Sequence, residues 1–217
     1  MVNKCPFTPR RGYVDARSEY LYHFHNIDDD NDDEETNSKM NLPTKSMVAS
    51  TDAADPLYFW QLYSLIGHTL VVEIVTDFYQ RVFADTANPW FRDVFVGAAP
   101  LRHHINAQVA YWVDAFGGGR CYHGGDYRLQ FHHSHNAHEI MNAKGAKRWM
   151  EHMRATLESL YEKGQFPADD PRIFGCIVNF LETKMRTYAM DHRWQFDESD
   201  FSSLKEMNNV NERAVDR

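Results

Sequence analysis

The sequence predicts an all-α domain that follows an acidic N-terminal extension. From Pro56 onward the apolar residues recur with the 3.6-residue period of helices, and no segment shows a convincing strand-like alternation. Before that point, residues 28–35 read Asp-Asp-Asp-Asn-Asp-Asp-Glu-Glu. The length of 217 residues suits one domain plus a tail.

The acidic run indicates where the N-terminal extension ends and the helical domain begins. Like charges repel one another, and no apolar residues are interleaved with them, so residues 1–55 are expected to form a disordered extension. The helical domain is then expected over residues 56–195. Residues 196–217 are expected to form a polar C-terminal tail.

Composition and charge exclude several classes of function. With 43% hydrophobic and 25% charged residues, the chain is typical of a soluble globular protein. Most of the net charge of -8 comes from residues 28–35, so no basic stripe predicts a nucleic-acid or membrane partner. No apolar run approaches the ~20 residues of a membrane span, and the first thirty residues lack a signal-peptide core. Three widely spaced cysteines favour a reducing compartment, and we expect the cytoplasm.

The first two expected helices end at clear breaking signals. The first stripe is interrupted at Asn88-Pro89, and the second stops at the glycines of residues 117–119. The first stripe consists of Leu62, Leu65, Ile66, Leu70, Ile74, Phe78 and Val82, and the second of Ile105, Val109, Trp112, Val113 and Phe116.

Two further helices begin at residues suited to helix starts. Asn142 is a good N-cap for the third helix, and Pro171 lies in the first turn of the fourth. The third stripe consists of Trp149, Met153, Leu157 and Leu160, and the fourth of Phe174, Ile177, Val178, Leu181, Met185 and Tyr188. The chain is therefore expected to have four substantial helices.

The connection over residues 117–141 is unusual, because a loop of this length is uncommon in a compact domain unless it has a function. It carries histidines at positions 132, 133, 135 and 138, and neutral imidazole is the commonest metal ligand. Three interpretations stay open: a polar surface segment, a zinc or copper site, or one axial histidine to a haem iron. Aromatic residues suited to a haem cleft are Phe78, Tyr79, Phe95, Tyr111, Trp112 and Trp149.

The order of four motifs resembles that of the truncated (two-over-two) haemoglobins, most closely group II. Ile66-Gly67 with residues 77–82 is similar to the family's B helix, and residues 90–95 to the turn that brings an aromatic onto the haem. Residues 108–118 are similar to the distal helix and its double-glycine stop. Residues 148–153 are similar to the start of the G helix, with the tryptophan that marks group II.

This resemblance implies a truncated globin-like two-over-two helical sandwich that binds haem b, iron protoporphyrin IX. It implies binding of dioxygen, nitric oxide and carbon monoxide, with nitric oxide dioxygenase or peroxidase-like activity as further expectations. Such activity needs an external electron donor, because the chain has no flavin or nicotinamide signature. The alternative is a non-haem metal-binding or ligand-sensing interaction protein that uses the histidine-rich loop.

The resemblance also implies the residues around the haem. Tyr79 occupies the position of a distal tyrosine, and Trp149 offers an indole N–H donor. Gln108 and His104 are four residues apart, so they share a helix face on the distal side. Where the family has a small residue, His104 is expected to close the pocket, act as a gate or bind iron as a sixth ligand. Phe95 is expected to pack flat on the porphyrin.

The proximal iron ligand has two candidates. The spacing of Gly125, Leu129 and His133 reproduces the family's glycine, leucine and histidine, which selects His133 and places Leu129 beside the haem. Counting without gaps from the double glycine selects His135 instead, and His135 keeps the family's five-residue step to Ile140. We favour His133 and expect the other histidine to lie nearby or to contact a propionate.

Overall fold

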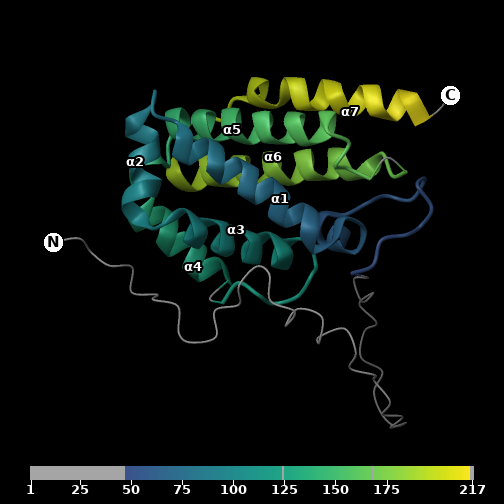
Figure 1. Cartoon of the computed structure of the whole chain (residues 1–217), viewed down its shortest axis with the longest axis horizontal. Helices are drawn as coiled ribbons and strands as arrows, with labels where there is room; N and C mark the ends of the chain where they lie inside the picture. Colours follow the sequence, from purple (N-terminus) through teal and green to yellow (C-terminus); the bar gives the residue numbers. More distant parts are fainter. Residues whose placement is uncertain (1–46, 124, 168, 216–217) are drawn as a thin grey trace, which may run out of the picture.

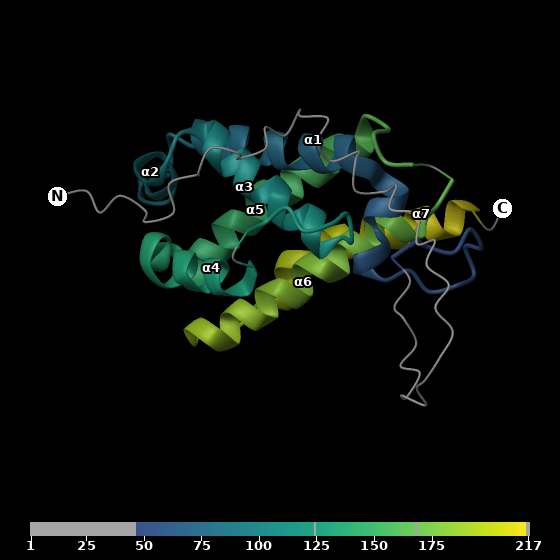
Figure 2. The same cartoon turned by 90° about the horizontal axis from the view of Figure 1, so that it is seen from below.

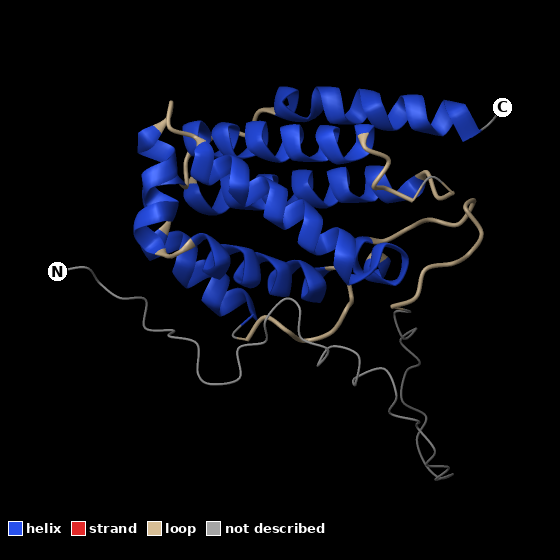
Figure 3. Cartoon of the chain, in the orientation of Figure 1, coloured by secondary structure: helices blue, strands red, loops and turns tan. Residues whose placement is uncertain are grey.

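A computed structural model of the chain describes residues 47–123, 125–167 and 169–215 (Figure 1). Helices and loops make up this described part, without a strand, which confirms the all-α prediction (Figure 3). The expected disorder of residues 1–46 falls outside the described residues.

In the described part of the chain the four expected helices are present, and three more α-helices accompany them. The α-helices are α1 (Tyr63–Ala84), α2 (Pro89–Ala98), α3 (Leu101–Ala115), α4 (Gly125–Phe131), α5 (Ala143–Glu162), α6 (Arg172–His192) and α7 (Ser202–Val215). Short 3-10 helices cover Phe59–Gln61, His138–Ile140 and Glu198–Phe201, and a π-helix covers His132–Asn136. Residues 90–95, expected as a turn, lie inside α2 because Pro89 starts a helix there.

The helices form two crossed layers, as expected for a two-over-two sandwich. Helix α1 packs against α3 and crosses α5, while α5, α6 and α7 run side by side (Figure 1). Figure 2 shows the same arrangement from below, with α1 and α3 on one side and α6 on the other. The layers place the helix faces around a shared core.

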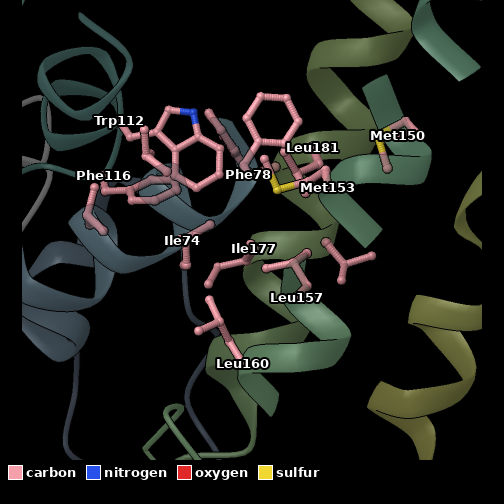
Figure 4. Packing of buried hydrophobic residues seen from close by; sticks show 14 of the residues in the cluster. Ile74, Phe78, Trp112, Phe116, Met150, Met153, Leu157, Leu160, Ile177 and Leu181 are labelled. Atoms are coloured by element: carbon pink, nitrogen blue, oxygen red, sulfur yellow. The ribbon is translucent and has the colours of Figure 1, made fainter. Parts of the chain in front are cut away.

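The core contains the apolar stripes that the sequence predicts. Phe78 of α1, Trp112 of α3, Leu157 of α5 and Ile177 of α6 are completely or almost completely buried and meet between the layers (Figure 4). Each fully buried side chain of this size contributes roughly 1.5–3 kcal/mol. The core therefore fixes the spacing of the layers from which the site is built.

Two glycines are required by the backbone. Gly67 has φ 64° and ψ -173° inside α1, a conformation that L side chains rarely adopt, and it divides the helix at a kink. Gly117 has φ 89°, and a Cβ there would lie 1.9 Å from the Trp60 carbonyl oxygen. The predicted glycine stop of α3 therefore depends on both conformation and space.

The C-terminal segment is a packed helix, where the sequence predicted a polar tail. Phe201 and Leu204 are fully buried, and Lys205 Nζ of α7 lies 2.7 Å from Glu182 Oε2 of α6. Phe201, the last residue of the 3-10 helix, and Leu204 of α7 lie three positions apart and give this segment a buried side although its composition is polar.

The described end of the N-terminal segment also contacts the domain. Arg172 donates hydrogen bonds to the carbonyl oxygens of Ser50, Asp52 and Asp55 at 3.0, 2.8 and 2.8 Å. Its guanidinium also pairs with Asp170 at 2.6 Å. The boundary expected at residue 55 marks a change in composition. In the structure, residues 50–55 are nevertheless held against the start of α6.

A buried carboxylate joins the end of α1 to α5. Asp85 Oδ2 accepts hydrogen bonds from Arg148 Nε at 2.7 Å and His152 Nε2 at 3.0 Å. Its other oxygen accepts from Asn88 Nδ2 at 3.0 Å. Because Arg148 precedes Trp149 in α5, this network holds the first turns of α5 in place.

We expect Asp85→Ala to destabilise the protein by about 3 kcal/mol, the low end of the cost of breaking a buried ion pair, because Arg148 is partly exposed. Burial raises the pKa of Asp85, but hydrogen bonds from Arg148, Asn88 and His152 outweigh it and hold the pKa well below its ordinary value. The unfolded chain therefore takes up the proton first. The contribution is complete at pH 7 and is lost as the pH falls below about 4.

Urea unfolding of the wild type and of Asp85→Ala, at pH 7 and at lower pH, measures the difference in their free energies of unfolding. Asp93→Ala is the matched control, because Asp93 is an exposed carboxylate paired with Arg92 at 2.8 Å. Its loss should cost less than about 1 kcal/mol. Equal effects of the two substitutions would contradict a structural role for Asp85.

Candidate functional site

A cavity lies between α3, the α4 and π-helix segment, and the helices α5 and α6. Its wall is mainly apolar and aromatic, with a few polar groups. The wall residues are Gln108, Tyr111, Trp112, Leu129, His133, Ile140, Met141, Ala146, Trp149, Phe180, Leu181, Lys184, Met185, Tyr188 and Trp194. Among the residues predicted for the site, Gln108, Leu129, His133 and Trp149 therefore meet at one cavity.

His133 is an imidazole suited to binding a metal. Its ring lies edge-on to Tyr188, with 4.6 Å between the centroids. Burial first, and then the nearby His132, His192 and Lys184, lowers the pKa of His133 to about 3. The ring is therefore neutral at pH 7, which is the form that metals bind.

His133 and His135 both belong to the π-helix, but only His133 lines the cavity. Ala137 N donates to the His132 carbonyl at 3.0 Å, and this wider turn accommodates one residue more than an α-turn. His135 is exposed, stacks on Phe131 at 4.1 Å and lies with Nδ1 3.0 Å from the Phe131 carbonyl. His135 is not part of the cavity wall.

Gln108 of α3 and Trp149 of α5 are donors in the cavity wall, whereas Tyr79 of α1 contacts Gln108 from outside that wall. Tyr79 donates a long hydrogen bond of 3.4 Å to Gln108 Oε1, which leaves the Gln108 amide N–H groups as donors. Burial, and next the neighbouring Tyr122, raises the pKa of Tyr79, so its phenol stays protonated. Trp149 packs against Phe78 with 4.7 Å between the ring centroids.

His104 and Phe95 lie beside Tyr79, outside the cavity wall. The Phe95 carbonyl accepts a hydrogen bond from His104 Nε2 at 2.9 Å, and the two aromatic rings are 5.7 Å apart. Burial lowers the pKa of His104, so the ring is neutral, and its centroid is 5.3 Å from that of Tyr79. The expected flat packing of Phe95 on a porphyrin therefore has no counterpart in the cavity wall.

Residues of α6 complete the wall, although sequence reasoning predicted no functional role for them. Phe180, Lys184 and Tyr188 are spaced four residues apart and share one face. Phe180 and Tyr188 are indistinguishable from core residues in sequence. A lysine between them on the same face is the signal that could have revealed a ligand-facing surface.

A larger cavity of about 650 Å³ lies between the start of α5 and the segment after α6. Its wall contains neither an imidazole nor a thiol, so it offers no histidine or cysteine ligand to iron. Within residues 47–123, 125–167 and 169–215, no three histidine, cysteine or acidic side chains converge as a metal site. The histidine-rich loop therefore presents no ligand set for zinc or copper there.

The model of the family described as bacterial-like globin matches residues 61–186, more than half of the chain. This chain belongs to that globin family. Globins hold a haem and bind diatomic gases such as dioxygen, so this globin is a haem-based ligand-binding protein. No solved structure matches it significantly. No helix in the described part of the globin is long and apolar enough to cross a membrane.

The residues of the cavity fit a haem in chemical type. A neutral imidazole, aromatic walls and several donors are the groups that a haem pocket uses. The cavity itself measures about 100 Å³, below the roughly 300–1,000 Å³ of typical ligand sites. The side chains between α4 and α6 must therefore move apart to admit a macrocycle.

Proposed function

We propose that this globin is a truncated haemoglobin of group II that holds haem b through His133. One observation carries the proposal: His133 shares a single cavity with the donors Gln108 and Trp149. When bound, the haem iron supplies a centre for dioxygen, nitric oxide and carbon monoxide and for one-electron chemistry. The position of Trp149 near the start of α5 supports the group II assignment.

The donors favour retention of a ligand over rapid release. A diatomic ligand with partial negative charge is stabilised by the indole N–H of Trp149 and the amide of Gln108. The phenol of Tyr79 joins them when it exchanges its long 3.4 Å hydrogen bond to Gln108 Oε1 for one to the ligand. Slow escape suits chemistry or sensing better than bulk oxygen transport. Cys121 and Cys176 are free thiols, which is consistent with a cytoplasmic location.

His104 is assigned a gating or positioning role. Its Nε2 is held by the Phe95 carbonyl, and binding iron through that nitrogen would require breaking this hydrogen bond. Its ring also packs on Phe83, with 5.7 Å between the centroids. The ferrous protein is therefore expected to be five-coordinate in the absence of gas.

Nitric oxide dioxygenation is the activity that we assign to this pocket. The reaction is NO + O2 + e⁻ → NO3⁻, and an external one-electron donor must supply the electron. The cavity residues Trp149 and Gln108 contribute by holding dioxygen, and the aromatic wall contributes by excluding water. Tyr79 acts beside them from outside the wall, where it contacts Gln108.

Nitrate yield tests this activity. Haem-loaded ferrous protein, equilibrated with dioxygen and freed of excess reductant, is mixed with nitric oxide. We expect one nitrate per haem, and sustained turnover when a reductant is supplied. The haem-free protein is the control. Nitrate formation no greater than in that control would contradict the assigned activity and leave gas binding to be tested separately.

A further inference from the structure

Tyr111 places an unsatisfied polar group at the candidate haem cavity. Its phenol oxygen is buried and has no hydrogen-bond partner among the described residues. Tyr111 belongs to the cavity wall, and its ring packs edge-on to Tyr122 at 5.6 Å. A buried hydroxyl without a partner is unfavourable, and a partner from outside the chain, a water or a ligand group, would satisfy it.

Lys184 approaches the same place from α6. Its Nζ lies 5.6 Å from the Tyr111 ring centroid and 5.8 Å from that of Phe180. Lys184 also lines the cavity, and within the described residues no carboxylate lies within ion-pair distance of it. The two aromatic rings hold the ammonium group beside the phenol.

We propose that Tyr111 and Lys184 together bind a carboxylate of the cofactor, one of the two propionates of iron protoporphyrin IX. This inference rests on the proposed haem-binding function. A carboxylate accepts from both an O–H and an ammonium donor, so one group would satisfy the phenol and neutralise the lysine. Most of the nearby wall is apolar and suits the ring of the macrocycle.

Two forms of the cofactor separate charge recognition from packing. Hemin carries two carboxylates, and hemin dimethyl ester has the same ring with both carboxylates blocked as esters. The variants are Tyr111→Phe and Lys184→Met, with Tyr161→Phe and Lys163→Met as matched controls away from the cavity. The measurement is the rate at which each loaded protein transfers its cofactor to excess apomyoglobin.

We expect each cavity variant to lose hemin roughly tenfold faster, as for a lost hydrogen bond to a charged group. The rate at which each cavity variant loses hemin dimethyl ester should differ less than about twofold from that of the wild type. An ester carries no charge for either residue to bind. Both control variants should retain both cofactors as the wild type does. Equal acceleration for the two cofactors, or none for hemin, would overturn the proposal.

The stability of the cofactor-free protein provides a second readout. Tyr111→Phe removes a hydroxyl that has no partner, so the urea midpoint of the apo-protein should stay the same or rise. A purely structural role would lower both that midpoint and hemin retention, which would overturn the proposal. If the wild type binds no hemin at all, the haem function itself fails and this inference fails with it.

Discussion

Replacing His133 with alanine is expected to accelerate haem loss by at least about a hundredfold. Loss of an outer-shell partner alone costs 10–100-fold in metal affinity, and His133 is the proposed direct ligand. The side chain lines the cavity, and its imidazole is neutral at pH 7. Transfer of hemin to excess apomyoglobin, followed by absorption, measures the rate.

His135→Ala is the matched control, because His135 is exposed and lies against Phe131. It should leave haem retention within about threefold of the wild type, as for a surface substitution of less than ~0.5 kcal/mol. Both variants should also be made with His104→Ala, since His104 could hold the iron from the other side once the proximal bond is lost. Rapid loss from His135→Ala with retention by His133→Ala would move the ligand to His135.

Tyr79→Phe is expected to release dioxygen about tenfold to hundredfold faster than the wild type. The substitution keeps the ring and removes only the hydroxyl, whose hydrogen bond to a partly charged acceptor is worth roughly 1.5–3 kcal/mol. Burial raises the pKa of Tyr79, so the hydroxyl is a donor throughout the physiological pH range. Stopped-flow displacement of dioxygen by carbon monoxide gives the dissociation rate.

Trp149→Phe should act in the same direction, because it removes the indole N–H from the cavity wall. Tyr161→Phe removes a hydroxyl at a distance and controls for a general effect; Tyr161 packs against Phe174 at 5.3 Å. Dioxygen dissociation that is unchanged in both Tyr79→Phe and Trp149→Phe would remove these residues from the ligand pocket.

The main helices could be predicted because their stripes are long and their ends carry strong signals. Asn142 caps α5 through a hydrogen bond from Gly145 N at 3.0 Å, as its position predicts. Helix α7 escaped prediction because few of its residues, such as Leu204, are apolar and buried. Helix α4 is seven residues long, too short for a periodic pattern to stand out.

The site was less predictable because its decisive features are three-dimensional. The choice between His133 and His135 depends on a π-turn, and spacing along the chain does not reveal such a turn. Asp85 and Arg148 are 63 residues apart, so their ion pair was not visible in either local motif. Lys184 and Tyr111 come from different helices, and only packing brings them to one cavity.

Hemin titration of the purified apo-protein tests the haem-binding account most directly. An axial histidine and an aromatic cavity should bind one hemin per chain and produce an intense Soret band with a sharp one-to-one endpoint. His133→Ala should blunt this endpoint under the same conditions. A wild-type protein that stays colourless in haem-supplied cells and takes up no added hemin would contradict the account.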